Sequence, residues 1–194
     1  NEYLSGALGE NILIYGAQLE VGSYSSSLIN TQGSAVTRLA DSCSQTPPDG
    51  VIGQTEGTLF AEVIATQDGL WYLSLSDGTT SNWVFIGQER TATSTFRAYL
   101  RAGAVTYADI YSPIITKGIN KIAIGYKQND VVFYVNGVQV GSDTSANMPS
   151  NLSNFYLSSA NAAGGLQVLT GSIKQTLLYN TRLSNSELAA LTQV

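Results

Sequence analysis

The sequence has no histidine and a single cysteine, Cys43. Without imidazole groups, the chain lacks the commonest general base, the Ser-His-Asp arrangement and histidine-based metal sites. One cysteine forms neither an intrachain disulfide nor a thiolate metal cluster. These absences exclude most hydrolase and zinc chemistries, and packing alone must hold the fold together.

Charge is also scarce, because Asp, Glu, Lys and Arg make up 12% of the chain and its net charge is −5. Binding to a phosphate backbone needs clustered Lys and Arg, so we expect no nucleic-acid partner. No apolar run approaches the roughly 20 residues that cross a bilayer, and the amino end lacks a basic-then-apolar secretion signal. We therefore expect no membrane insertion.

Turn residues and aromatic rings are abundant, with 19 Gly and 11 Tyr. A first strand is predicted at 11–19, and the polar segment after it ends in the turn or linker signal Pro47-Pro48-Asp49-Gly50. We place a domain boundary there: 1–50 is a strand and linker, the end of a preceding module, and 51–194 is the main domain. Short apolar runs between turn signals predict an all-β sandwich. These runs lie at 58–65, 70–75, 82–87, 95–102, 105–111, 121–127, 131–135, 138–140, 154–158 and 172–179.

Two local elements carry specific signals. Asn136-Gly137 suits the positive φ angles of a type I′ turn, so 131–140 is predicted to be a hairpin. The turn at 128–130 adds the preceding strand, which gives a three-stranded antiparallel meander.

Ser184 lies three residues before Glu187 and an apolar run follows, so a capping box and a short helix over 184–192 are predicted.

Alternation along the strands predicts which faces are buried. Strand 95–102 separates apolar side chains from a polar and aromatic set, and strand 105–111 is expected to gather rings around Asp109, which a dry core tolerates poorly. By contrast, 58–65 and 131–135 are apolar on both sides apart from Glu62, as expected for inner strands or a face covered by another segment. The polar and aromatic side of the first strand carries Arg97, Tyr99 and Arg101, and one side of the second strand carries Val105, Tyr107, Asp109 and Tyr111.

The hairpin and its flanks carry a family resemblance. Ile122-Ala123-Ile124-Gly125-Tyr126 leads into Phe133-Tyr134-Val135-Asn136-Gly137, and Gly171-Ser172-Ile173-Lys174 leads through Leu178-Tyr179-Asn180 to Arg182-Leu183-Ser184 and Glu187-Leu188. This part of the chain, 55–194, resembles the concanavalin A-like, laminin G-type superfamily. The resemblance implies an all-β, two-sheet antiparallel jelly-roll sandwich with a short C-terminal helix, here after an extended N-terminal segment.

A second resemblance lies upstream. The residues are Ile14-Tyr15-Gly16-Ala17-Gln18-Leu19-Glu20, Gly22-Ser23, Val36-Thr37-Arg38 and Asp41. They resemble the GAQLE…SAVTR-x-AD linker of bacteriophage and prophage tail proteins. The resemblance implies a virion protein of the tail fibre, usually a homotrimer, whose partner is a bacterial cell-surface glycan.

The sequence offers no paired carboxylates for catalysis. Laminarinase-type enzymes of this fold use a Glu-x-Asp-x-x-Glu strand, since two carboxyl groups must flank the glycosidic bond. Glu62 stands alone on its strand, and Asp68 and Asp77 lie singly next to glycines, as turn aspartates do. We therefore expect a protein that is not an enzyme, with a depolymerase or a tyrosine-based lyase as the less favoured alternative.

Sugar sites need exposed rings for stacking and planar polar groups for paired hydrogen bonds, and arginines also suit an anionic sugar. The alternatives are that both tryptophans belong to the core and that the arginines form a solvated face or a subunit contact. The candidate carbohydrate-binding residues are Trp71, Trp83, Arg97, Tyr99, Arg101, Tyr107, Asp109 and Tyr111.

No cofactor is expected, although Ca²⁺ at the rim of the sandwich is an open alternative, with oxygen ligands available from Asp77, Asp109, Asp130 or Asp143. The favoured function is a carbohydrate-binding, host-receptor-recognition domain. The rival is a structural or trimerisation spacer of the fibre, which low charge and two-sided apolar strands also fit.

Overall fold

The computed structural model describes residues 28, 33–34, 43–45, 47–66, 71–89, 95–115, 117–157 and 172–194. Internal contacts divide the chain into two units, Asn1–Ala40 and Asp41–Val194. The strand predicted at 11–19 and the residues of the tail-protein linker motif lie outside the described residues. The second unit holds all the elements that follow.

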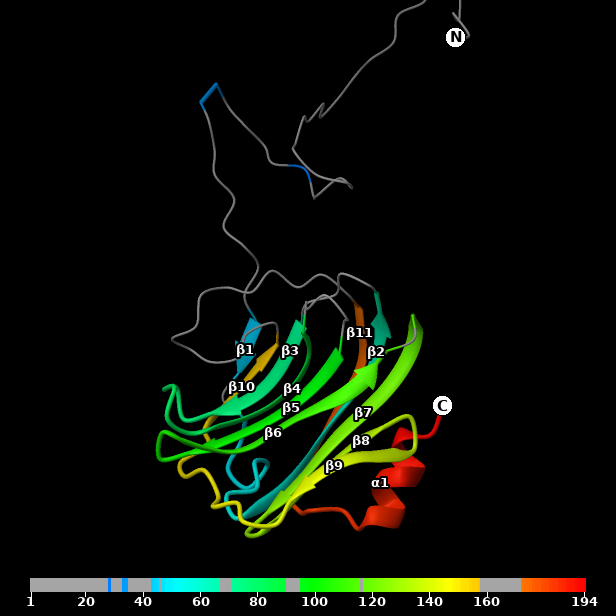
Figure 1. Ribbon diagram of the computed structural model, residues 1–194. Coiled ribbons are helices and arrows are strands. Elements are labelled where there is room, and N and C mark those ends of the chain that lie inside the picture. Colours follow the sequence, from blue (N-terminus) through cyan, green and yellow to red (C-terminus); the bar gives the residue numbers. More distant parts are fainter. Residues whose placement is uncertain are drawn as a thin grey trace, which may run out of the picture. The chain divides into compact units, whose positions relative to one another are not determined.

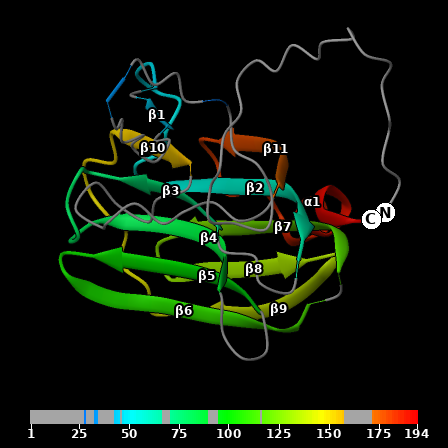
Figure 2. The same cartoon turned by 90° about the horizontal axis from the view of Figure 1, so that it is seen from above.

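The described part of this unit is an antiparallel two-sheet sandwich with one helix, as the sequence predicted (Figure 1). One sheet has six strands in the order β1-β10-β3-β4-β5-β6, and the other has five in the order β11-β2-β7-β8-β9. Seen from above, the strands β4, β5 and β6 of one sheet overlap β7, β8 and β9 of the other (Figure 2). The elements are β1 (Cys43–Gln45), β2 (Glu56–Ala65), β3 (Trp71–Ser76), β4 (Trp83–Glu89), β5 (Thr95–Ala102), β6 (Val105–Ile114), β7 (Gly118–Lys127), β8 (Asp130–Val135), β9 (Val138–Asp143), β10 (Asn154–Leu157), β11 (Ser172–Tyr179) and α1 (Asn185–Thr192).

The predicted meander is confirmed as β7, β8 and β9, paired in succession. Asn136 and Gly137 both have positive φ, 50° and 82°, as a type I′ turn requires. The side-chain oxygen of Asn136 also accepts a hydrogen bond of 2.9 Å from the backbone N–H of Lys121. The turn is therefore set by its own residues and tied back to β7.

The core lies between the sheets and is built from inward-facing side chains of both sheets. Trp71 alternates with Leu73 and Leu75 on β3, and all three are fully buried. The Trp71 indole N–H donates to Oε1 of Gln88 at 3.3 Å, so its polar atom is satisfied within the core. Facing them from the five-stranded sheet are Leu59, Val63, Ile122, Ile124, Tyr126 and Phe133.

Helix α1 covers the outer face of the five-stranded sheet, where it contacts β7, β8 and β9 (Figure 1). The predicted capping box is present: Ser184 accepts from the N–H of Glu187, and Glu187 accepts from the N–H of Ser184. Leu188 is fully buried against Phe60, Ala123 and Val132. The apolar outer residues of β2 and β8 are thus explained by the helix that packs on them.

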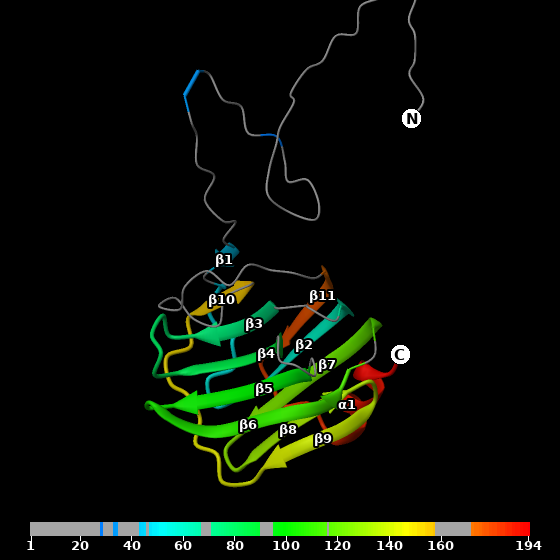
Figure 3. The same ribbon diagram turned by 45° about the horizontal axis from the view of Figure 1, so that its top comes forward.

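Within the described residues no helix has the length and apolar character that a membrane span needs. The outer face of the six-stranded sheet differs in character from the helix-covered face of the other sheet. There β3, β4, β5 and β6 lie side by side (Figure 3), and their outward side chains are aromatic and charged. That face is the one in which the predicted site residues meet.

Candidate functional site

Cross-strand register brings the outward residues of four strands together. Phe85 of β4 is opposite Tyr99 of β5, which is opposite Asp109 of β6, and Arg97 is opposite Tyr111. Because side chains alternate along a strand, these residues share the outer face of the sheet. We call this set the outer aromatic face: Tyr72, Trp83, Phe85, Glu89, Arg97, Tyr99, Arg101, Asp109 and Tyr111.

Four rings pack into one cluster on this face. Phe85 and Tyr99 stack with 5.0 Å between centroids and 14° between planes. Trp83 lies 5.2 Å from each of these rings, and Tyr72 meets Phe85 edge to face at 5.3 Å and 82°. Tyr72, Phe85 and Tyr99 are buried in the cluster, whereas Trp83 is partly exposed. The four rings therefore hold one another in place and form a packed aromatic layer, which we call the aromatic floor.

Arg97 lies over this floor and between two carboxylates. Its Nε is 2.7 Å from Oδ1 of Asp109 and its Nη2 is 3.0 Å from Oδ2, while Nη1 is 2.8 Å from Oε1 of Glu89. Its guanidinium carbon is 4.9 Å from the Tyr99 ring centroid and 5.0 Å from that of Tyr111. Paired bonds to a carboxylate and cation–π contacts both favour one fixed orientation of the guanidinium.

The electrostatics of the face follow from these contacts. Burial opposes the charge of Arg97, but the hydrogen bonds that it donates to Asp109 and Glu89 raise its pKa above the ordinary value. Burial, then the charge of Glu89 and a hydrogen bond to it, raises the pKa of Tyr72. Burial also raises the pKa of Tyr111. These shifts move both phenols further from the deprotonated form that a base would need.

Of the eight predicted residues, five gather on the outer aromatic face beside Trp83, and two lie elsewhere. Trp71 lies in the core, fully buried. Tyr107 packs against the core and its hydroxyl accepts a hydrogen bond from the side-chain amide of Asn147 at 2.6 Å. The expectation that Tyr107 shares a side with Asp109 and Tyr111 is wrong, because a register shift between Leu100 and Arg101 places an extra residue in β6. The five are Arg97, Tyr99, Arg101, Asp109 and Tyr111.

Sequence reasoning missed Tyr72, Phe85 and Glu89. Phe85 lies with Trp83 in the outer cluster, so the alternative that places Trp83 in the core does not hold. Glu89 ends β4 and its carboxylate reaches Arg97 on the neighbouring strand. The available signal was alternation on 83–89, where Trp83, Phe85 and Glu89 occupy one side and Val84 and Ile86 the other. That pattern places both rings opposite the core.

The four aspartates considered for Ca²⁺ are engaged separately. Asp109 binds Arg97, and Asp130 lies 2.8 Å from Nη2 of Arg182. Asp77 accepts from Thr79 and Asn82, and these hydrogen bonds outweigh burial and lower its pKa. Asp143 accepts from the N–H of Ser145 at 2.8 Å. Across the described ranges, His, Cys, Asp and Glu side chains form no group of three that could hold a metal ion.

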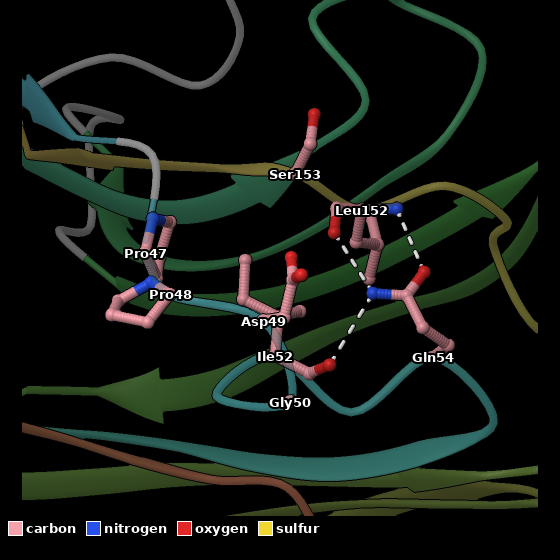
Figure 4. Close-up of a pocket in the computed structure, with 8 residues that line it drawn as sticks. All are labelled: Pro47, Pro48, Asp49, Gly50, Ile52, Gln54, Leu152 and Ser153. Carbon is pink, nitrogen blue, oxygen red and sulfur yellow. Dashed lines mark hydrogen bonds between the residues drawn. The ribbon is translucent and has the colours of Figure 1, made fainter.

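Two small hollows lie away from this face. One, of about 130 Å³, lies where the turn Pro47–Gly50 meets Leu152 and Ser153 (Figure 4). Gln54 closes it: its amide N–H groups donate to the carbonyls of Ile52 (3.3 Å) and Leu152 (2.8 Å), and its oxygen accepts from Leu152 N–H (3.0 Å). This amide ties the entering chain to the loop before β10.

The second hollow, the rim pocket, has a volume of about 230 Å³ and lies at the β6 and β9 edge. It is lined by Ser112, Pro113, Ile115, Asn120, Val135, Asn136, Val138 and Val140.

Several solved structures share this fold. Ruminococcus gnavus IT-sialidase CBM40 bound to α2,3-sialyllactose has a TM-score of 0.62 and 16% identity, over 81% of this chain and 96% of that chain. The leech intramolecular trans-sialidase has a TM-score of 0.60 and 16% identity, over 81% of this chain and 27% of its own. Mouse laminin α1 domains LG4-5 have a TM-score of 0.57 and 11% identity, over 75% of this chain and 41% of that chain. At these identities the likeness concerns the fold.

No curated protein matches the sequence significantly. A family model does, that of the concanavalin A-like lectin/glucanase superfamily in its laminin G form, and it matches residues 41–189. The match contains every strand described above and most of α1, in agreement with the two-sheet antiparallel sandwich and its C-terminal helix. The chain therefore belongs to the concanavalin A-like lectin/glucanase superfamily.

Proposed function

We propose that this domain is a carbohydrate-binding module without catalytic activity, and that the outer aromatic face is its binding surface. The observation that carries the proposal is the placement of Arg97 over the ring cluster, with Asp109 and Tyr111 in contact with its guanidinium. Saccharides present apolar C–H faces and directional hydroxyls, so a ring beside fixed polar groups matches both.

The exposed part of the face supports this role. Tyr111 is 45% exposed, and the Asp109 side chain is 38% exposed beside it. Trp83 is partly exposed at the other end of the ring cluster, next to Arg101 on the neighbouring strand. A ligand lying along β4 to β6 would meet a tyrosine and a carboxylate at one end and an indole and a guanidinium at the other.

The same contacts argue against glycoside hydrolysis. A glycosidase needs one protonated carboxylic acid and one free carboxylate flanking the scissile bond. Here Glu89 and Asp109 both bind the guanidinium of Arg97, so neither carboxyl group is free to flank a scissile bond as acid or nucleophile. Tyr72 and Tyr111, with raised pKa values, are unsuited to the base role of a lyase. The face is arranged for holding a ligand.

In its biological setting we propose a receptor-recognition domain of a bacteriophage tail fibre, displayed on the virion as a homotrimer and bound to a bacterial surface glycan. The support is the resemblance of the upstream segment, from Ile14 to Asp41, to tail-protein linkers. Three copies on one fibre would turn weak single-site binding into avidity. Weak sites suit a reversible first contact with a cell.

The proposal is tested by screening the purified protein on an array of bacterial and mammalian glycans. Binding should fall strongly in Tyr111→Ala, which removes the exposed ring of the face. The matched control is Tyr179→Ala, since Tyr179 lies on β11 of the other sheet. If no glycan binds while the protein still assembles into trimers, the spacer function replaces this one. Equal loss in both variants would place the site elsewhere.

A further inference from the structure

The hydrogen-bonding capacity of Arg97 is largely used inside the protein. A guanidinium has five N–H donors, and the bonds from Nε and Nη2 to Asp109 and from Nη1 to Glu89 occupy three of them. The flat sides of the group are in contact with rings, at 4.9 Å from Tyr99 and 5.0 Å from Tyr111. Arg97 thus positions its neighbours and has little left to offer an incoming anion.

The net charge at this end of the face is negative, because two carboxylates surround one guanidinium. Glu89 and Asp109 each carry a negative charge within hydrogen-bond distance of the single positive charge of Arg97. A sugar carboxylate or sulfate that approached Arg97 would lie close to both carboxylates, and like charges repel at that range. The chain as a whole, at −5, adds no attraction for an acidic polymer.

The groups that remain available to a ligand are hydrogen-bond acceptors, the carboxylate oxygens. Each carboxylate oxygen has lone pairs beyond the one that Arg97 uses, and the Asp109 side chain is 38% exposed. Sugar hydroxyls are donors of the kind that bind carboxylates through short, charge-assisted hydrogen bonds. The open ring of Tyr111, next to Arg97, offers a stacking surface for the C–H face of the same sugar.

We infer that the ligand of the outer aromatic face is a neutral saccharide, bound by hydroxyl donation to Asp109 and by stacking on Tyr111, with Arg97 as the residue that positions the carboxylate. This inference rests on the proposed function and names the class of glycan. It separates this face from recognition of acidic sugars, such as the sialyllactose that the Ruminococcus gnavus module binds.

The competing possibility centres on Arg101. Its Nη2 donates to the carbonyl of Ala104 at 2.9 Å, and none of the ion pairs among the described residues includes it. Its Nε and the indole Nε1 of Trp83, the residue opposite it, have no hydrogen-bond partner. An acidic sugar would therefore have to bind at the Trp83 and Arg101 end. The experiment must distinguish the two ends.

The test is calorimetric titration of the wild-type protein with matched oligosaccharides, one set built of neutral hexoses and N-acetylhexosamines and the other of uronic, sialylated or sulfated sugars. We expect binding of a neutral sugar. Its affinity should change little between about 0.05 and 0.5 M NaCl, because a neutral ligand forms no ion pair that salt could screen. Asp109→Asn should weaken it about tenfold by loss of the charge-assisted bond. Glu62→Gln is the matched control, a carboxylate that pairs with Lys174 on the other sheet.

Binding confined to acidic sugars, weakened by salt and lost in Arg101→Gln, would overturn this inference while leaving carbohydrate binding in place. Absence of binding to either set would overturn the proposed function and the inference with it. Because the salt dependence is measured on the unmodified protein, the test stands even if Asp109→Asn fails to fold.

Discussion

Arg97 reaches diagonally across the sheet to Asp109, with 2.7 Å from Nε to Oδ1 and 3.0 Å from Nη2 to Oδ2, although the residue directly opposite it on β6 is Tyr111. The diagonal contact leaves Tyr111 free to flank the guanidinium with its ring. The pair therefore fixes a cation, a carboxylate and an aromatic ring in one constellation.

The first prediction concerns this constellation. Arg97→Lys keeps the charge but loses the paired hydrogen bonds and the planar contact with the rings. A lysine ammonium is a compact group, without the planar set of donors that a guanidinium has. We expect the free energy of unfolding to fall by about 2 kcal/mol, measured by urea denaturation. In the Asp109→Asn background the same substitution should cost clearly less, because the pair is already broken. Equal costs in both backgrounds would show that Arg97 and Asp109 do not cooperate.

The second prediction concerns the helix that covers the five-stranded sheet. Ser184→Ala removes the side-chain acceptor of the capping box and should destabilise the protein by about 1 kcal/mol. Ser186→Ala, two residues into the same helix and exposed, is the control and should change stability by less than about 0.5 kcal/mol. Denaturant midpoints of the two variants check this. Similar midpoints would mean that the capping box does not stabilise α1.

The third prediction concerns the buried contact of the same helix. Leu188→Ala leaves a cavity against Phe60, Ala123 and Val132 and should cost about 3 kcal/mol. Leu188→Met, which nearly conserves volume, should cost less than about 1.5 kcal/mol. Thermal and urea unfolding of both variants provide the comparison. A small effect of the alanine variant would indicate that the helix detaches without loss of the sandwich.

The fourth prediction is a pH dependence at the alkaline end. Burial and the neighbouring Glu89 raise the folded-state pKa of Tyr72, and burial raises that of Tyr126. A raised pKa contributes stability that is present below the unfolded pKa of about 10 and is lost as pH rises beyond it. Melting temperatures should therefore decline above about pH 10. The decline should be shallower in Tyr72→Phe, and an unchanged slope would show that Tyr72 is not protected from ionisation.

Most of the fold could be predicted from the sequence because its signals are local. The runs 95–102 and 172–179 match β5 and β11 in full, and Ser184 with Glu187 fixes the start of α1. Alternation between apolar and polar side chains reports burial directly when one face of a strand is dry. The turn at Asn136-Gly137 follows from the backbone preferences of those two residues alone.

The site was only partly predictable because it depends on pairing between strands. Alternation alone cannot reveal the extra residue in β6 near Arg101 that turns Tyr107 toward the core. The contact between Glu89 and Arg97 requires the register of β4 against β5, which no local pattern encodes. Trp71 and Trp83 each begin a strand, yet one faces the core and the other the outer face, and only the alternation along each strand separates them.

The most direct test of the account is an NMR titration of the isotope-labelled protein with a saccharide that binds it, following backbone amides and the indole N–H signals. The account predicts shifts concentrated at Arg97, Asp109 and Tyr111, with Trp83 responding and the buried indole of Trp71 nearly unchanged. Shifts centred instead on the rim pocket around Pro113 and Val138, with the outer aromatic face silent, would contradict it.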